Sequence, residues 1–215
     1  MQKTLKIALF GSTGMIGSRI AAEAARRGHQ VTAFARRPER LAELGANVSV
    51  RQGDLFDTGA TAATLAGYDV IASAYAPPQD DLAKIVDASR ALVELARASG
   101  VKRVVAVGGA GSLEVAPGKQ LVDTDSFPAA YKAIALAHRD ALGFYRSVSD
   151  VDWTFFAPAA LIAPGTRTGT FRTGTDALIV DAEGKSAISA EDYAVAFVDE
   201  LEAARFTRKL ATVGY

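Results

Sequence analysis

The sequence predicts an α/β fold in which helices cover both faces of a parallel sheet. Short apolar runs alternate with helical patterns along most of the chain. Strands that are apolar nearly throughout are typical of a parallel sheet buried on both faces. The predicted strands lie at about 5–10, 30–35, 47–51, 69–74, 102–107 and 152–156. The predicted helices lie between them at about 15–27, 37–44, 58–65, 80–98 and 127–146.

The clearest helical pattern runs from residue 82 to residue 97. One helix face there would be apolar apart from a single serine, with charged residues on the other faces. Gly28 and Gly100 stand just past two predicted helices, where a glycine commonly ends a helix. The residues of the apolar face are Leu82, Ile85, Val86, Ser89, Leu92, Val93 and Ala96.

The regular alternation weakens after Ala157, and residues 158–189 are rich in proline, glycine and threonine. Because ligands of doubly wound folds lie at the carboxyl ends of the strands, this segment is either a substrate-side lobe or a surface excursion. We expect one domain over residues 1–215. The remaining predicted elements are strands near 169–173 and 177–181, a helix from Ser189 to about Ala204, and a strand from Lys209 to Tyr215.

Composition argues against several functional classes. Lysine plus arginine equal aspartate plus glutamate at 24 each, so nothing favours nucleic acid or an anionic membrane as a partner. Cysteine is absent and the two histidines, His29 and His138, lie far apart in sequence, so we expect no metal site. The N-terminus lacks the pattern of a signal peptide, and its apolar run is too short to span a bilayer. We expect a cytoplasmic monomer or homodimer whose partner is a small molecule.

A glycine loop, GSTGMIG, joins the first predicted strand to the first predicted helix. Gly11 permits a tight turn, Gly14 permits close approach of a pyrophosphate, and Gly17 lets the helix pack on the strand. Backbone N–H groups at a helix start bind such phosphates, and no lysine follows as in triphosphate-binding loops. The alternative is a glycine turn without a ligand. The predicted cofactor-binding residues here are Gly11, Ser12, Thr13, Gly14, Met15, Ile16 and Gly17.

The end of the second predicted strand distinguishes NADP from NAD. An NAD site has an Asp or Glu there, but this sequence has Arg36 and Arg37 and no acid. A guanidinium binds phosphate with charge and paired hydrogen bonds, so NADP(H) is the predicted cofactor. Two solvated arginines at the start of a helix are the alternative, although the helix dipole disfavours cations at that position.

Two further strand ends are expected to contact the cofactor. Asp54 and Leu55 follow the third strand and are placed beside the adenine, with Asp54 near its exocyclic amine. Ser73, Ala74 and Tyr75 follow the fourth strand and are placed under the pyrophosphate and the nicotinamide ribose. These placements follow from strand order, and either stretch could instead be ordinary turn chemistry.

These residues resemble the atypical short-chain dehydrogenase/reductases, above all the NmrA-like and flavin reductase (biliverdin-IXβ reductase)-like group. The resemblance covers nearly the whole chain and implies a Rossmann fold. It does not imply one activity, because such proteins include reductases, epimerases and cofactor sensors without turnover. The matching stretches, in chain order, are GSTGMIG, ARRPERL, GDLFD, VVAVGGAGSL and DWTFFAPAALIAPG.

The usual catalytic residues of that superfamily are missing. Its members use a Tyr with a Lys four residues later, which lowers the pKa of the phenol, and a Ser at the end of the fifth strand. Here Ala135 stands four residues after Tyr131, and Lys132 points elsewhere on the helix. Gly108 and Gly109 stand where the Ser would be.

Three hypotheses follow from this broken pattern. The preferred one is an NADPH-dependent reductase of flavin reductase-like type, which orients a planar or small carbonyl acceptor and needs little acid–base help. The others are a non-catalytic NADP(H) sensor and an NAD(P)-dependent epimerase, which the missing Tyr–Lys pair disfavours. Tyr131 and His138 are candidate catalytic residues; the alternatives are a half-buried aromatic and a surface histidine. The resemblance also places Gly108, Gly109 and Pro158 beside the cofactor.

Overall fold

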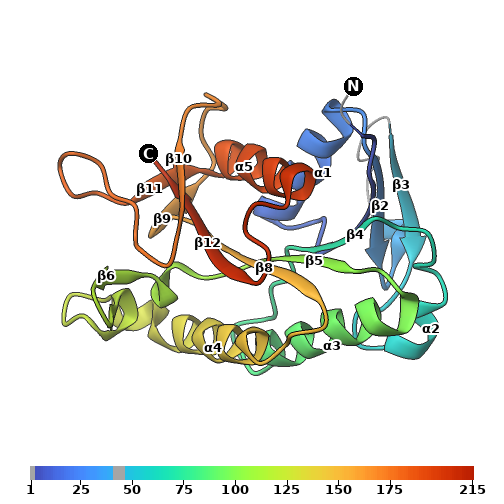
Figure 1. Cartoon of the computed structure of the whole chain (residues 1–215), viewed down its shortest axis with the longest axis horizontal. Coiled ribbons are helices and arrows are strands. Elements are labelled where there is room, and N and C mark those ends of the chain that lie inside the picture. Colours follow the sequence, from blue (N-terminus) through green and yellow to red (C-terminus); the bar gives the residue numbers. More distant parts are fainter. Residues whose placement is uncertain (1–2, 41–46) are drawn as a thin grey trace.

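Eight strands form one central sheet in the computed structural model, which describes residues 3–40 and 47–215 (Figure 1). All strand pairs of this sheet are parallel except β10–β12, so the predicted doubly wound α/β fold is confirmed. The strands, in spatial order, are β10 (Arg172–Thr175), β12 (Lys209–Gly214), β8 (Asp152–Ala157), β5 (Arg103–Val107), β4 (Val70–Ser73), β1 (Lys6–Phe10), β2 (Gln30–Ala35) and β3 (Val48–Gln52).

Helices cover the two faces of the sheet (Figure 1). One face carries α1 (Met15–Arg26) and α5 (Ala190–Ala203), and the other carries α3 (Lys84–Ser99) and α4 (Ala129–Arg146) with the short α2 (Thr58–Ala62). Alternate residues of each central strand therefore enter two separate apolar cores. In β1, Ile7 and Leu9 join the core under α1 and α5, while Ala8 and Phe10 join the other.

The periodic face predicted for residues 82–97 packs on the sheet as α3. Ile85, Ser89, Leu92 and Val93 are buried there. Gly100 ends this helix with a φ of 77°. Gly28 follows α1 with a φ of 84°, so both glycines adopt the left-handed conformation expected of helix ends.

One predicted helix lies partly outside the described residues, and one predicted strand differs from the structure. The helix predicted at 37–44 begins as a single 3-10 turn, Pro38–Arg40, and residues 41–46 lie outside the described residues. The strand predicted near 177–181 is absent, and β10 lies at 172–175, overlapping the strand predicted near 169–173. Asp176 ends β10 with a φ of 58°, and the N–H of Leu178 then bonds the carbonyl of Glu114.

Four short strands were not predicted. A hairpin of β6 (Glu114–Ala116) and β7 (Lys119–Gln120) follows the 3-10 turn Ala110–Ser112 and precedes another at Leu121–Asp123. In the C-terminal segment, β9 (Leu161–Ala163) pairs with β11 (Ala187–Ser189) in parallel. Because β11 leads directly into α5, this pairing fixes both ends of the segment. Residues 158–189 therefore contain more regular structure than their content of proline, glycine and threonine predicts.

The carboxylate of Asp192, in the first turn of α5, fixes the C-terminal segment. It is fully buried and accepts hydrogen bonds from the N–H groups of Thr168 and Gly169 at 2.8 Å each. The hydroxyls of Thr168 and Tyr215 also donate to it. Burial acts to raise the pKa of Asp192, but these hydrogen bonds outweigh it and the pKa lies below its ordinary value.

Asp192→Ala is expected to destabilise the protein by about 2–4 kcal/mol at pH 7, because it removes a buried carboxylate and the four hydrogen bonds that it accepts from Thr168, Gly169 and Tyr215. A carboxylate with a lowered pKa stabilises the fold above the ordinary pKa near 4, and this stabilisation is lost as the pH falls through the folded value. Urea unfolding should therefore show a smaller difference from wild type at pH 3 than at pH 7. Glu183→Ala, at an exposed position of the same segment, is the control and should change little. An equal difference at both pH values would contradict this account.

Candidate functional site

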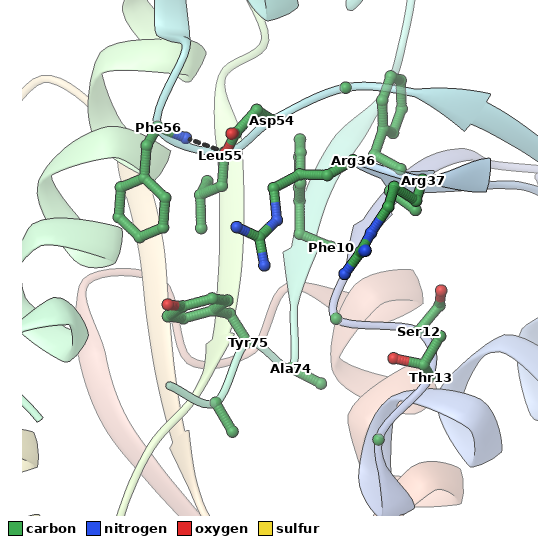
Figure 2. A pocket seen from close by; sticks show the side chains of 16 residues that line it. Phe10, Ser12, Thr13, Arg36, Arg37, Asp54, Leu55, Phe56, Ala74 and Tyr75 are labelled. Atoms are coloured by element: carbon green, nitrogen blue, oxygen red, sulfur yellow. Dashed lines mark hydrogen bonds between the residues drawn. The ribbon is translucent and has the colours of Figure 1, made fainter. Parts of the chain in front are cut away.

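A cavity of about 340 Å³ lies at the carboxyl ends of the neighbouring strands β4, β1, β2 and β3 (Figure 2). It adjoins the point between β4 and β1 where the order of the strands reverses, the usual ligand position in doubly wound sheets. Its lining comes from four stretches of the chain. These are Phe10–Gly14, Phe34–Arg37, Gly53–Phe56 and Ala74–Ala76.

The fold itself requires two of the three loop glycines. Gly11 has a φ of 81°, and a Cβ there would lie 2.5 Å from the carbonyl carbon of Ala74. A Cβ on Gly17 would lie 2.0 Å from the carbonyl oxygen of Gly11. The loop is therefore packed between the end of β4 and the first turns of α1, with no room for a side chain at either position.

Gly14 is different, because the surrounding protein leaves room for a side chain. Its φ of −75° suits any residue, and the nearest atom to a Cβ there would be the oxygen of Gly11 at 3.7 Å. Gly14 is the N-cap of α1, has no side-chain cap and lines the cavity. A helix start without a capping side chain presents its free N–H groups to an anion, as pyrophosphate sites require.

Arg36 and Arg37 both line the cavity from the end of β2. Figure 2 shows the guanidinium of Arg36 extending over the ring of Tyr75 and that of Arg37 directed toward Ser12 and the glycine loop. Both residues are exposed, and neither forms an ion pair with a described residue. The cavity thus holds two positive charges, without an ion pair to any described residue, beside a helix N-terminus, an arrangement that attracts phosphate groups.

Asp54 faces these arginines from the loop after β3, but one of its carboxylate oxygens is already engaged. Its Oδ1 accepts a hydrogen bond from the N–H of Phe56 at 3.0 Å. Phe56 is 41% exposed and meets Tyr75 edge to face, with ring centroids 5.5 Å apart. Burial raises the pKa of Tyr75. Sequence reasoning missed Phe56, although an aromatic residue directly after a strand-end turn was the available signal.

Leu55 is buried and lines the cavity, as predicted. Other predicted cofactor residues lie outside it, among them Met15, Ile16 and Gly17 in the first turn of α1. Ser73 is buried, and its hydroxyl accepts a hydrogen bond from the N–H of Tyr75 at 3.2 Å.

The loop after β5 packs against side chains behind it. A Cβ on Gly108 would lie 2.8 Å from Phe155, and one on Gly109 would lie 2.9 Å from His138. Pro158 is buried at the end of β8. The roles assigned to Gly108, Gly109 and Pro158 beside a nicotinamide stay predictions.

The structure separates the two candidate catalytic residues. Tyr131 lies in the first turn of α4, is 64% exposed and does not line the cavity. His138, two turns later, is half-buried against Gly109 and Phe155, so it is not the surface histidine of the alternative interpretation. Lys132 is exposed. A catalytic role for either Tyr131 or His138 stays a prediction.

Comparison with known proteins assigns the family. A model of a family described as NAD(P)H-binding matches residues 11–208, which include the glycine loop and every residue that lines the cavity except Phe10. The chain belongs to this NAD(P)H-binding family. The predicted resemblance to atypical short-chain dehydrogenase/reductases is thereby confirmed, and so is the dinucleotide-binding character of the chain.

Solved structures of relatives share the fold over nearly the full chain. A Burkholderia pseudomallei protein, provisionally named an exported protein, is 66% identical with a TM-score of 0.92, covering 99% of this chain and 100% of its own. A provisionally named epimerase from Bacteroides thetaiotaomicron is 37% identical with a TM-score of 0.90, covering 99% and 98%. A provisionally named NADH-flavin reductase from Streptococcus pneumoniae is 32% identical with a TM-score of 0.88, covering 98% and 99%.

The family is therefore of oxidoreductase and epimerase type, and this chain is an NAD(P)H-binding member of it. None of the helices within residues 3–40 and 47–215 is long and apolar enough to cross a membrane. The expectation of a cytoplasmic location stays a prediction.

Gly14→Ala is expected to leave folding nearly intact, since the free protein has room for the methyl group. It should weaken dinucleotide binding by at least about tenfold, which corresponds to about 1.4 kcal/mol, because the methyl group would occupy the approach of the pyrophosphate. Fluorescence titration with NADPH and thermal unfolding of the same samples measure the two effects.

Two alanine variants serve as controls. Gly17→Ala should lower the unfolding temperature, because its Cβ would collide with the backbone of Gly11. Gly143→Ala, in α4 and with no atom within 4 Å of a Cβ, should stabilise the helix slightly and leave binding unchanged. Wild-type affinity in Gly14→Ala would show that the pyrophosphate does not lie at this loop.

Proposed function

We propose that the protein is an NADPH-dependent reductase that transfers hydride to a planar or small carbonyl acceptor. The observation that carries the choice of NADP over NAD is the pair Arg36 and Arg37. These exposed guanidinium groups line the dinucleotide cavity without a described ionic partner, at the strand end where NAD sites have an acid. The 2′-phosphate of NADP supplies the negative charge that this position lacks.

The side chains of the two arginines extend in different directions, which suggests a different role for each (Figure 2). Arg37 extends toward the hydroxyls of Ser12 and Thr13, and these groups together are suited to hold the 2′-phosphate. Arg36 lies over the ring of Tyr75, and its planar guanidinium is suited to cover the adenine. Phe56 extends the apolar wall beside Tyr75 and excludes water from the adenine edge.

The residues of this chain are suited to orienting the cofactor and the acceptor, and less suited to transferring a proton to the acceptor. When bound, the cofactor supplies a hydride. Ala135 replaces the usual lysine and Tyr131 is largely exposed, so α4 lacks the Tyr–Lys pair that moves a proton in the superfamily. Acceptors that take their proton from solvent fit this arrangement, and a flavin-like or other planar ring is the preferred class.

An epimerase is the second candidate, favoured by the 37% identity to the Bacteroides thetaiotaomicron protein. Its reaction would require a residue that removes and returns a proton, and the missing Tyr–Lys pair argues against this. An NmrA-like sensor that binds NADP(H) without turnover is the third. The proposal includes a small-molecule partner, a cytoplasmic monomer or homodimer, and neither nucleic acid nor membrane as a partner.

Arg37→Ala is expected to weaken NADPH binding by about 10- to 100-fold while hardly changing NADH binding, because it removes charge-assisted hydrogen bonds to the 2′-phosphate alone. Arg36→Ala should weaken both cofactors, because it removes a contact with the adenine. Isothermal titration calorimetry with 2′,5′-ADP and with 5′-AMP measures the contribution of the 2′-phosphate to the binding free energy. Arg97→Ala, which loses a surface ion pair with Asp150, is the control. Equal affinity of the wild type for NADPH and NADH would overturn the NADP assignment.

Purified protein with NADPH is expected to reduce at least one acceptor from a panel of flavins, quinones and small carbonyl compounds. Loss of NADPH absorbance, compared with the rate without protein, measures turnover. Tight NADP binding without turnover of any acceptor would favour the sensor. Exchange of a sugar proton with solvent deuterium, without net NADPH loss, would favour the epimerase.

A further inference from the structure

A second, much smaller cavity of about 20 Å³ lies behind the carboxyl ends of β4 and β5. Tyr75 lines both this cavity and the main one. The polar residues of the small cavity are Ser73, Ser89, Tyr75 and His138. The Ser89 hydroxyl donates to the carbonyl of Ile85 and the Ser73 hydroxyl accepts from the N–H of Tyr75, so each can form a further hydrogen bond. A polar space of this size accommodates one water molecule.

The two edges of the His138 ring face different surroundings. Nδ1 is buried and forms no hydrogen bond with any described residue. The loop after β5 packs against the base of the ring, because a Cβ on Gly109 would be 2.9 Å from Cβ and Cγ of His138 and 3.0 Å from its Cδ2. The ring also packs against Phe155, with centroids 6.0 Å apart. The imidazole is therefore held between Gly109 and Phe155 with its Nδ1 enclosed.

Among the described residues that line the small cavity, none carries a charge that would compensate a protonated imidazole. The one other titratable group that lines the small cavity is the Tyr75 phenol. Burial lowers the pKa of His138 to about 4. Helix α3 and the strands contribute only uncharged side chains, namely Ile85, Ala88, Ser89, Leu92, Ser73, Ala106, Val107 and Phe155.

We propose that His138 is a neutral hydrogen-bond donor of the active site, with Nε2–H directed to the nicotinamide end and Nδ1 accepting from a water held by Ser73 and Ser89. This inference rests on the proposed reductase function. A neutral imidazole with Nδ1 as acceptor carries its single proton on Nε2. It donates to the acceptor atom that gains electron density as the hydride arrives, and it keeps that proton. The hydride carries two electrons from NADPH, and solvent supplies the one proton.

This role explains why the glycines after β5 are required. A side chain on Gly109 would displace the ring of His138, and one on Gly108 would displace Phe155, which supports the ring. Because the loop after β5 has glycines where the superfamily has a serine, it leaves room for the imidazole of His138 at that position. His138 replaces a hydroxyl donor with an N–H donor from the helix behind the loop.

Nitrogen-15 NMR of the imidazoles tests the proposal directly, because the chain has two histidines. His138→Gln assigns the signals, and His29 serves as the internal reference, since its Nδ1 accepts from the N–H of Leu5 at 3.2 Å. His138 is expected to stay neutral from pH 5.5 to 8 and to show the Nε2–H tautomer. A titration midpoint near 6.5 or the Nδ1–H tautomer would overturn the proposal, whether or not the protein binds a cofactor.

Titration with two ligands, followed by the His138 NMR signal, then tests whether His138 lies beside the nicotinamide. The His138 signal is expected to shift with NADP and to stay unchanged with 2′,5′-ADP, which lacks the nicotinamide. If both ligands bind and the His138 responses are the same, His138 does not face the nicotinamide. If neither ligand binds by calorimetry, the proposed function fails, and the pH titration and tautomer still decide the state of His138.

Steady-state kinetics of His138 variants distinguishes hydrogen-bond donation by the imidazole from a role in packing alone. His138→Phe should lower kcat by about 100-fold with little change in the KM for NADPH, because only the donor is lost. His138→Gln retains an N–H donor and should keep more activity than His138→Phe. Wild-type kcat should be flat between pH 5.5 and 8. Lys132→Ala, exposed on the same helix, is the control. Wild-type kcat in a folded His138→Phe, or equal loss in both variants, would overturn the role.

Discussion

The close packing of the glycine loop between β4 and α1 is the constraint on which the site depends. The space around Gly11 and Gly17 is so small that a single methyl group at either position would collide with backbone. This packing brings the first turn of α1 against the ends of β1 and β4 and aims its free N–H groups into the cavity. Of the three loop glycines, only Gly14 has room for a side chain. Its small size therefore matters more for ligand binding than for folding.

Ionic contacts hold the helix behind this loop. Glu23 of α1 is 5% exposed and pairs with Arg26, Arg27 and Arg167 at 2.8–3.0 Å. These guanidinium groups outweigh the effect of burial and hold the pKa of Glu23 far below its usual range. Arg27 also pairs with Asp199 of α5. Because Arg167 belongs to the C-terminal segment, one buried carboxylate connects the glycine-loop helix, α5 and that segment.

Much of the fold and of the dinucleotide site could be predicted, because each depends on local pattern. Apolar runs place the central strands, and parallel order alone brings the glycine loop, Arg36, Asp54 and Tyr75 to one edge. The pairing of β9 with β11 could not be predicted, since Leu161 pairs with Ala187, 26 residues later, and such pairing depends on the tertiary fold. The position of His138 also required the structure, because it depends on how α4 packs against the loop after β5.

The charges of Arg36 and Arg37, which form no ion pair within the described part of the chain, link the stability of the molecule to its cofactor. Two guanidinium groups at neighbouring positions repel each other when no anion lies between them, and a helix N-terminus nearby adds to the positive potential. Binding of a dianion relieves this repulsion in the folded state alone. At a free cofactor concentration of 100 times Kd, the gain in folding free energy is about 2.7 kcal/mol. The folded lifetime of the protein would therefore follow the supply of dinucleotide, and salt that screens the arginines would weaken that dependence.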